Sequence, residues 1–340
     1  MDNSKNLNII ALDAMGGDYG PEVTVPAAVE ATKKKDLAVI LVGEKELIDR
    51  ELSKFSSLET SLLSVVPAQG VVTEEESPAL AYRTKPRASV YVAAGVVKAG
   101  KASGFVSMGS TGASIAASTV LYGTMDGIER GAIGGPVIGY SPRTVIVDLG
   151  TNVDTRPEQL LDFGALGSIM SRVIYKEKNP KIALLSVGKE KGKGSSLVKE
   201  TSVLLENSGL NFVGNIEGRH LLTSEADVLI CDGFVGNTLL KFAESWITFF
   251  SDEIKDKVNE KLSYKIGAEL MKPVFDDLKA KYDYEEHGGT PLLGVNGISI
   301  VCHGSSGPRS IMNSIFLGQK CIQNNLIEDT QKSLAIHFGH

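Results

Sequence analysis

The sequence predicts an α/β fold, with a three-layer, Rossmann-like, mostly parallel sheet and helices on both faces. Three observations predict it. Short apolar runs rich in Val, Ile and Leu recur with little alternation, which is typical of strands buried on both faces. Segments with helical spacing lie between these runs. Several of the loops that follow the runs combine glycine with Ser, Thr, Asn or Asp.

The predicted strands are the apolar runs themselves, namely Leu7–Leu12, Leu37–Val42, Leu62–Val66, Gly104–Ser107, Thr144–Asp148, Ile182–Val187, Val228–Cys231 and Ile298–Cys302. The predicted helices between them include Pro26–Lys35, Ser89–Lys98, Pro157–Tyr175 and Ser196–Asn207. The longest helical stretch runs from Thr238 to about Tyr282. We expect a single domain over residues 1–340, with a projecting amphipathic helical element at about residues 244–282.

Composition narrows the possible functions. The chain has 340 residues, of which 42% are hydrophobic and 22% charged, so it can bury a full core. A net charge of −6 argues against nucleic-acid binding, which needs a basic face. The first residues lack the pattern of a signal peptide, and no apolar run approaches the ~20 residues of a spanning helix. We therefore expect a cytoplasmic protein, with peripheral contact to the inner face of the cell membrane left open.

The three cysteines, Cys231, Cys302 and Cys321, are far apart and have no CxxC spacing. Neither a disulfide framework nor a zinc site is expected from them. Cys231 and Cys302 both end apolar runs, so we predict buried free thiols. The five histidines form no ligand pattern, and no metal site is predicted.

Six predicted strands end in loops of similar composition: DAMGGD (Asp13–Asp18), SMGSTGAS (Ser107–Ser114), DLGTNVD (Asp148–Asp154), SVGKEKGKGSS (Ser186–Ser196), CDGFVGNT (Cys231–Thr238) and CHGSSG (Cys302–Gly307). Ligands of open α/β sheets bind outside the carboxyl ends of strands, where glycines let backbone N–H groups approach. We expect the six loops to lie on one edge and form one crevice for an oxyanion. The alternative is that they are only tight turns.

Motifs of other chemistries are absent or fail. The segment Gly95–Ala102 nearly matches a phosphate loop, but Ala102 replaces the Ser or Thr that holds magnesium, and the segment runs from helix to strand. No GxGxxG follows the first strand, and neither GxSxG nor HExxH occurs. No cofactor is therefore predicted. The lack of a covalent nucleophile suggests one that arrives with the substrate, such as inorganic phosphate.

The motifs closely resemble those of the fatty acyl-ACP:phosphate acyltransferase family, known as PlsX. The resemblance covers nearly the whole chain in order, through IALDAMGGD (Ile10–Asp18), ESPALAYRTKPRAS (Glu76–Ser89), VKAGKASGFVSMGSTGA (Val97–Ala113), DLGTNVDTRPEQLLDFGALGS (Asp148–Ser168), NFVGNIEGR (Asn211–Arg219), ADVLICDGFVGNTLLK (Ala226–Lys241), DYEEHGGTPLLG (Asp283–Gly294) and HGSS (His303–Ser306). It implies a fold similar to the isocitrate and isopropylmalate dehydrogenases and to phosphotransacetylases. It also implies a homodimer, acyl carrier protein as the donor of the acyl group, and delivery of acyl phosphate to a membrane glycerol-3-phosphate acyltransferase.

The resemblance also implies two catalytic residues. Lys193 matches a lysine of the family that neutralises phosphate or accepts a proton; the alternative is a solvated charge beside Lys189 and Lys191. Asn237 matches an asparagine whose amide would donate to the thioester oxyanion. The alternative for Asn237, compatible with the first, is a helix N-cap before Thr238–Phe242.

We predict that phosphate lies against the backbone N–H groups of residues 109–112, near the glycines of DAMGGD and Asn152. The full set of predicted phosphate- or substrate-binding residues is Gly16, Gly17, Ser107, Gly109, Ser110, Thr111, Gly112, Asn152 and His303. Ser110 stands where the family usually has Asn, so its shorter side chain changes any direct contact with the ligand.

The segment Trp246–Phe275 has an amphipathic helical pattern, compatible with a hairpin. Apolar residues recur at spacings of three or four, with lysines between them; the apolar positions are Ile247, Phe250, Ile254, Val258, Leu262, Ile266 and Leu270. The apolar stripe either packs against a partner subunit or the core, or docks on a membrane surface.

Two further functions remain open at this point. A phosphotransacetylase-like enzyme would use acyl-CoA with the same thioester chemistry. A non-catalytic scaffold in lipid-precursor metabolism would need neither Lys193 nor Asn237, and both are present. A dehydrogenase is disfavoured by the missing dinucleotide fingerprint.

Overall fold

The computed structural model describes residues 7–34, 36–136, 143–223, 225–282 and 288–338. Two parts of the predictions lie outside the described residues: Lys35, the last residue of one predicted helix, and residues 283–287, the start of the Asp283–Gly294 motif.

Within the described residues, a single sheet of eleven strands forms the middle layer, in the order β3-β2-β1-β4-β11-β10-β5-β6-β9-β7-β8. The strands are β1 (Asn8–Asp13), β2 (Leu37–Gly43), β3 (Leu63–Pro67), β4 (Gly104–Ser107), β5 (Ala132–Pro136), β6 (Val145–Val147), β7 (Ile182–Leu185), β8 (Phe212–Ile216), β9 (Val228–Ile230), β10 (Thr290–Leu293) and β11 (Ile298–Val301). Most neighbouring strands are parallel, which confirms the predicted fold class.

The sheet has two parallel halves joined by antiparallel pairs. Strands β3, β2, β1, β4 and β11 run together, and so do β6, β9, β7 and β8. Between the halves, the pairs β11–β10, β10–β5 and β5–β6 are all antiparallel. Three reversals leave the two halves running in opposite directions. The expectation of six loops on one edge is therefore wrong: the sheet edge changes between the loops of β1, β4 and β11 and those of β6, β7 and β9.

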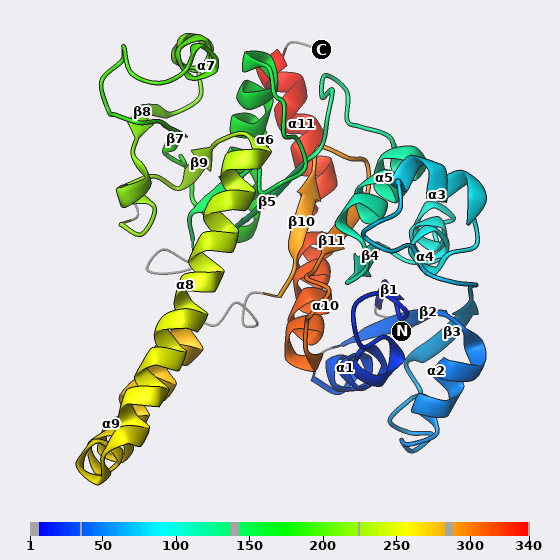
Figure 1. Cartoon of the computed structure of the whole chain (residues 1–340). Helices are drawn as coiled ribbons and strands as arrows, with labels where there is room; N and C mark the ends of the chain where they lie inside the picture. Colours follow the sequence, from blue (N-terminus) through cyan, green and yellow to red (C-terminus); the bar gives the residue numbers. More distant parts are fainter. Residues whose placement is uncertain (1–6, 35, 137–142, 224, 283–287, 339–340) are drawn as a thin grey trace, which may run out of the picture.

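Helices cover both faces of the sheet (Figure 1). One face carries α1 (Pro21–Lys34), α2 (Lys45–Leu52), α6 (Pro157–Tyr175), α10 (Pro308–Gln323) and α11 (Leu326–Phe338), and α7 (Ser196–Asn207) packs beside α6. The other face carries α3 (Pro78–Thr84), α4 (Ser89–Lys98) and α5 (Thr111–Tyr122). Phe163 and Phe105 are fully buried in the cores on these two faces.

All eight predicted strands are present, and three predicted helices, α4, α6 and α7, have the predicted bounds. Helix α1 begins at Pro21, so Pro26 lies inside the helix and not at its first turn as expected. The strands β5, β8 and β10 were not predicted. The sequence of β5, AIGGP, carries the glycine and proline that ordinarily exclude a strand. All three cysteines are buried and free, as predicted for Cys231 and Cys302.

Helices α8 (Gly233–Glu260) and α9 (Leu262–Tyr282) form a hairpin that projects from the body (Figure 1). The predicted single stretch is broken at Lys261, which has an extended backbone. Along the hairpin, large apolar side chains are exposed, among them Trp246 at 55% and Leu262 at 74%. Within the described residues, no helix has both the length and the apolar character needed to cross a bilayer.

Candidate active site

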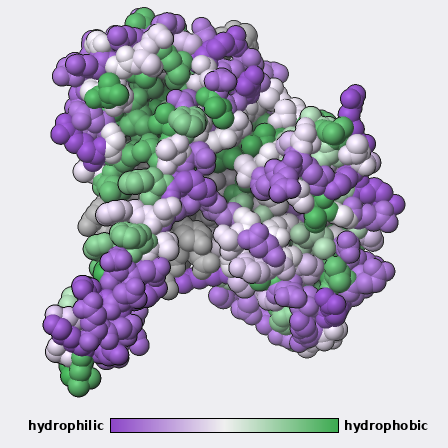
Figure 2. Space-filling model, viewed as in Figure 1, coloured by the Kyte–Doolittle hydropathy of each residue, from purple (hydrophilic) through white to green (hydrophobic). Residues whose placement is uncertain are grey.

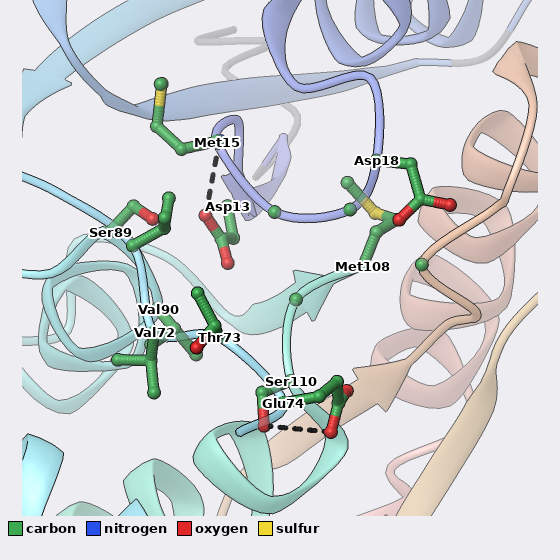
Figure 3. Close-up of a pocket in the computed structure, with 15 residues that line it drawn as sticks. Asp13, Met15, Asp18, Val72, Thr73, Glu74, Ser89, Val90, Met108 and Ser110 are labelled. Atoms are coloured by element: carbon green, nitrogen blue, oxygen red, sulfur yellow. Dashed lines mark hydrogen bonds between the residues drawn. The ribbon is translucent and has the colours of Figure 1, made fainter. Parts of the chain in front are cut away.

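A cavity of about 230 Å³ opens where β1, β4 and β11 end. Figure 3 shows how its walls converge from loops far apart in the sequence. The apolar part of the wall consists of Met15, Val71, Val72, Val90 and Met108, and the side chains with polar groups are Asp13, Asp18, Thr73, Glu74, Ser89 and Ser110. The backbones of Gly16, Gly17, Gly109 and Gly304 complete the lining.

Glycines let these loops approach each other more closely than any other residue would. A Cβ atom on Gly16 would lie 2.6 Å from the backbone nitrogen of Gly109. Gly17 has a φ of +82°, and a Cβ there would lie 2.7 Å from the carbonyl oxygen of Gly304. The backbone N–H of Asp18 donates to that carbonyl at 2.8 Å. The DAMGGD, SMGSTG and CHGSSG loops thus meet backbone to backbone around the cavity.

Helix α5 begins at the edge of this cavity. Ser110 is its N-cap, with a hydroxyl that accepts the backbone N–H of Ala113 at 3.3 Å. The carboxylate of Glu74 lies on the same turn, where it accepts the backbone N–H of Thr111 at 3.1 Å and the hydroxyl of Ser110 at 3.3 Å (Figure 3). A helix N-terminus attracts negative charge, so an oxyanion group already sits where the sequence predicts phosphate.

Asp13 is a buried carboxylate in the wall of the cavity, with an exposed fraction of 1%. Its Oδ2 atom accepts the hydroxyl of Ser107 at 2.7 Å, and Oδ1 accepts the backbone N–H of Met15 at 3.3 Å. Burial raises the pKa of Asp13 above its usual range, although hydrogen bonds from Ser89 and Ser107 act in the opposite direction.

Some of the predicted phosphate-binding residues come together at this cavity. Gly16, Gly17, Gly109 and Ser110 line it. Ser107 lies behind the lining, fully buried, where its hydroxyl accepts the backbone N–H of Gly109 at 3.0 Å and donates to Asp13.

Thr111 and Gly112 lie at the start of α5 but are not part of the lining. The backbone N–H of Thr111 is taken by Glu74. A Cβ on Gly112 would lie 2.7 Å from the Cγ atom of Pro78, so this glycine allows α3 to pack against α5. Substitution of Gly112 would therefore disturb helix packing as well as any ligand.

Asn152 lies away from the cavity, in the loop that follows β6. Its side chain is buried and donates to the carbonyl of Gly131 at 3.0 Å and to Oδ2 of Asp148 at 2.9 Å. The Asp148 carboxylate also accepts the backbone N–H groups of Gly150 and Thr151. This arrangement fixes the shape of the loop, and Asn152 is not part of the cavity lining.

Asn237 is exposed on the second turn of α8. Its Cβ lies 3.3 Å from the position that a Cβ on Gly150 would occupy, so it borders the loop after β6. The N-cap of this helix is Asp232, whose carboxylate accepts the backbone N–H of Val235 at 2.8 Å. The alternative in which Asn237 is itself an N-cap is therefore wrong, because the helix begins at Gly233.

Lys193 is exposed in the loop between β7 and α7. The neighbouring lysines have ion-pair partners, Lys189 with Glu225 at 2.8 Å and Lys191 with Glu206 at 2.7 Å. Lys193 has no such partner within the described parts of the chain. Because β7 pairs with β9 in parallel, the loops of Lys193 and Asn237 leave the same edge of the sheet.

His303 connects the two groups of loops. It follows β11, next to Gly304 of the cavity, and its Nε2 lies 3.2 Å from Oε1 of Glu244 on α8. Lys241, one helical turn beyond Asn237, lies with its Nζ 3.0 Å from Oε2 of Glu244 and 3.5 Å from Nδ1 of His303. Burial disfavours ionisation of Glu244, but His303 and Lys241 outweigh this effect and lower its pKa.

Neither Glu74 nor Asp13 was predicted as a site residue from the sequence. Glu74 begins a run of three acidic residues, which resembles an ordinary solvated loop. Asp13 stands inside the DAMGGD motif, but only the structure shows that its carboxylate is buried against Ser107.

The chain is similar in sequence to known proteins. Residues 9–329 match the family model described as "Fatty acid synthesis protein". The phosphate acyltransferase of Pelotomaculum thermopropionicum is 41% identical over 325 residues, which cover 96% of this chain and 94% of the relative.

Two solved structures share the fold. A phosphotransacetylase from Streptococcus pyogenes has a TM-score of 0.60 at 17% identity, covering 94% of this chain and 95% of its own. A 4-hydroxythreonine-4-phosphate dehydrogenase from Klebsiella pneumoniae has a TM-score of 0.53 at 14% identity, covering 95% and 100%. At these identities the likeness concerns the fold alone. By its sequence, the chain belongs to the fatty acid synthesis protein family, whose relatives here are named phosphate acyltransferases.

Proposed function

We propose that the protein is a phosphate acyltransferase that forms acyl phosphate from inorganic phosphate and the acyl thioester of acyl carrier protein. An oxygen of phosphate attacks the thioester carbonyl carbon, a C–O bond forms, and the C–S bond breaks. The sulfur leaves as the thiolate of the carrier and takes up a proton. The full-length relationship to phosphate acyltransferases carries this proposal.

The position of Glu74 supports a phosphate site on the first turn of α5. Its carboxylate accepts the N–H of Thr111, so this turn already holds an oxyanion group beside a cavity whose wall is partly apolar. Phosphate would displace that carboxylate and meet the backbones of Gly16, Gly17 and Gly109. The apolar side chains would exclude water from the thioester and so limit its hydrolysis.

Lys193 and Asn237 are our proposed catalytic residues. Lys193 would bring positive charge to the phosphate, which the cavity needs because Asp13, Asp18 and Glu74 line it. Lys193 itself does not line the cavity, so this role requires its loop to approach the cavity when the substrates bind. The amide of Asn237 would donate to the oxyanion that forms on the thioester carbonyl. The connection from Asn237 through Lys241 and His303 to Gly304 supports joint action of the two loop groups.

An acyl-CoA:phosphate transferase is the second candidate, favoured by the fold shared with a phosphotransacetylase. Both reactions form acyl phosphate and release a thiol, so the thiol carrier distinguishes them. The test is the initial rate of acyl phosphate formation with the same acyl group on acyl carrier protein and on CoA, at equal concentrations. A higher rate with the carrier protein supports our proposal, and a higher rate with CoA supports the alternative.

We further propose a homodimer that binds a membrane surface reversibly and delivers acyl phosphate to a glycerol-3-phosphate acyltransferase in the membrane. Figure 2 shows apolar side chains where the hairpin joins the body and at its far end. On α8, Phe242 and Phe250 stack on either side of Trp246, and all three are more than half exposed. This apolar group suits a subunit contact, and the tip around Leu262 suits lipid.

A further inference from the structure

The carboxylate of Asp13 occupies an unusual place for a structural group. It is buried, yet it lines the cavity in which we place phosphate. The described residues that line this cavity contribute three acidic side chains, Asp13, Asp18 and Glu74, and no Lys, Arg or His. A fully ionised phosphate next to the Asp13 carboxylate would be strongly repelled, since two like charges in contact cannot both stay ionised.

Two glycines pack their backbones closely beside this carboxylate. A Cβ on Gly16 would lie 2.9 Å from Oδ2 of Asp13, and a Cβ on Gly109 would lie 3.2 Å from the same atom. A side chain at either position would therefore crowd Oδ2. The same two glycines present the backbone to the cavity, so a ligand held by that backbone would lie beside Oδ2.

A comparison with Asp148 shows what a purely structural carboxylate looks like in this protein. Asp148 comes directly after β6, as Asp13 ends β1, and it is fully buried. Its oxygens accept the N–H groups of residues 150–152 in its own loop and the side-chain amide of Asn152, and it does not line the cavity. Asp13 also accepts an N–H of its own loop, that of Met15, but its Oδ2 accepts the hydroxyl of Ser107 from another strand, and it is part of the cavity wall.

We propose that Asp13 shares one proton with the bound phosphate, and that this shared proton makes the site accept hydrogen phosphate and reject sulfate. The inference rests on the proposed function. Phosphate carries a proton at neutral pH and can donate it in a hydrogen bond to Oδ2, which turns repulsion into a charge-assisted hydrogen bond. Sulfate has the same shape and charge but no proton at that pH. It cannot donate a hydrogen bond to the ionised carboxylate and would be repelled by it.

The test measures acyl phosphate formation at pH 8 with varied phosphate and with sulfate or arsenate as competitor, at constant ionic strength. In the wild type, the inhibition constant of sulfate should be at least about tenfold higher than the KM for phosphate. Arsenate carries a proton and should compete well with phosphate. Asp13→Asn replaces the carboxylate with an uncharged amide, which can donate or accept a hydrogen bond. In this variant, the ratio of the sulfate inhibition constant to the KM for phosphate should fall by about tenfold to a hundredfold. This factor corresponds to the free energy of a charge-assisted hydrogen bond.

Asp18→Asn is the matched control, because it removes one negative charge from the same cavity at an exposed position. A general effect of charge would shift sulfate and phosphate together in both variants. Only loss of the shared proton changes their ratio in Asp13→Asn and leaves it unchanged in Asp18→Asn.

A second measurement does not need Asp13→Asn, so it tests the inference even where that variant does not fold. Sulfate does not titrate between pH 8 and pH 6, so a change in its inhibition constant comes from groups of the protein that titrate in this range. Burial raises the pKa of Asp13, so the fraction of protonated Asp13 grows as the pH falls and sulfate inhibition should strengthen. Asp18 and Glu74 also line the cavity, so the series is repeated with Asp18→Asn and with Glu74→Gln, and the trend should persist in both.

The outcomes separate the inference from the proposed function. An active wild type in which sulfate competes as well as phosphate at pH 8 overturns the inference alone. So does an Asp13→Asn variant with the wild-type ratio, or sulfate inhibition that does not change with pH. A wild type that forms no acyl phosphate overturns the proposed function, and the inference with it.

Discussion

The carboxylate of Glu74 accepts the backbone N–H of Thr111 at 3.1 Å, which joins the loop before α3 to the first turn of α5. The same carboxylate accepts the hydroxyl of the N-cap Ser110. An internal acidic group thus covers the helix end at which we place phosphate. Substrate binding would have to displace it, so Glu74 competes with phosphate for the same donors.

Glu74→Gln should therefore strengthen phosphate binding. An anion at a helix N-terminus is worth ~0.3–1 kcal/mol, so the KM for phosphate should fall by up to about fivefold. Initial rates at varied phosphate measure this. Glu76→Gln is the control, because Glu76 lies two residues from Glu74 but pairs with Lys85 and Thr73. A higher KM in Glu74→Gln would show that Glu74 supports the site instead of competing with phosphate.

Lys193→Ala and Asn237→Ala should each lower kcat by about 10²–10³, the usual cost of losing one oxyanion donor. Asn237→Asp, which keeps the size of the side chain and removes the amide donors, should lose a similar amount. Lys191→Ala is the control for Lys193, because Lys191 lies in the same loop but pairs with Glu206. Near wild-type turnover in both alanine variants of folded protein would exclude a catalytic role for the two residues.

Leu262→Glu should abolish binding to anionic vesicles. Leu262 begins α9 at the far end of the hairpin and is 74% exposed, so a glutamate there costs little in the folded protein but opposes insertion among lipids. Vesicle sedimentation measures binding, which should also weaken with salt because lysines flank the stripe. Leu58→Glu, at an 83% exposed position beyond α2, should bind like the wild type. Wild-type protein that never sediments with anionic vesicles would contradict the membrane proposal.

Ile254→Glu would report on a different contact. Ile254 is only partly exposed on α8, whereas Leu262 is open to solvent. A glutamate at 254 should therefore lower the stability of the hairpin or the dimer. Gel filtration and thermal unfolding of this variant separate a packing defect from loss of lipid contact.

Asp162 should make stability depend on pH. Burial, with help from Glu129 and Glu158, raises the pKa of Asp162 to about 7. In the unfolded chain an aspartate titrates near pH ~4, so between these values the folded protein binds more protons and stability falls as pH rises.

Asp162→Asn should remove this dependence. Allowing for partial solvent screening, the variant should gain about 1–2 kcal/mol over the wild type at pH 8 and clearly less at pH 5. Urea unfolding at the two pH values measures the difference. An equal difference between variant and wild type at both pH values would show that Asp162 does not titrate with folding.

The fold class and the strands rich in Val and Ile followed from the sequence, because strands buried on both faces have continuous apolar runs. The strand β5 could not be predicted, because AIGGP has a low intrinsic strand propensity. It forms a strand because it pairs with β10 and β6. Missing β5 and β10 also hid the reversal between the two halves of the sheet. That reversal explains why the six loops do not share one edge.

The site was predicted in part for similar reasons. Glycine-rich loops after strands located Gly16, Gly17 and Gly109, because close backbone approach requires glycine. Asn152 does not line the cavity, and its side-chain amide donates to the carbonyl of Gly131 and to Asp148. The contact of Glu74 with Thr111 spans 37 residues of sequence, and no local pattern encodes such a pair.

The most direct test of the account is the fate of labelled phosphate. Purified protein is incubated with acyl-ACP and ³²P-labelled inorganic phosphate, and labelled acyl phosphate and free carrier thiol are followed together. The account predicts that both appear at equal rates, that neither appears without phosphate, and that Lys193→Ala slows both. Release of thiol without incorporation of label would indicate a thioesterase and would contradict the central claim.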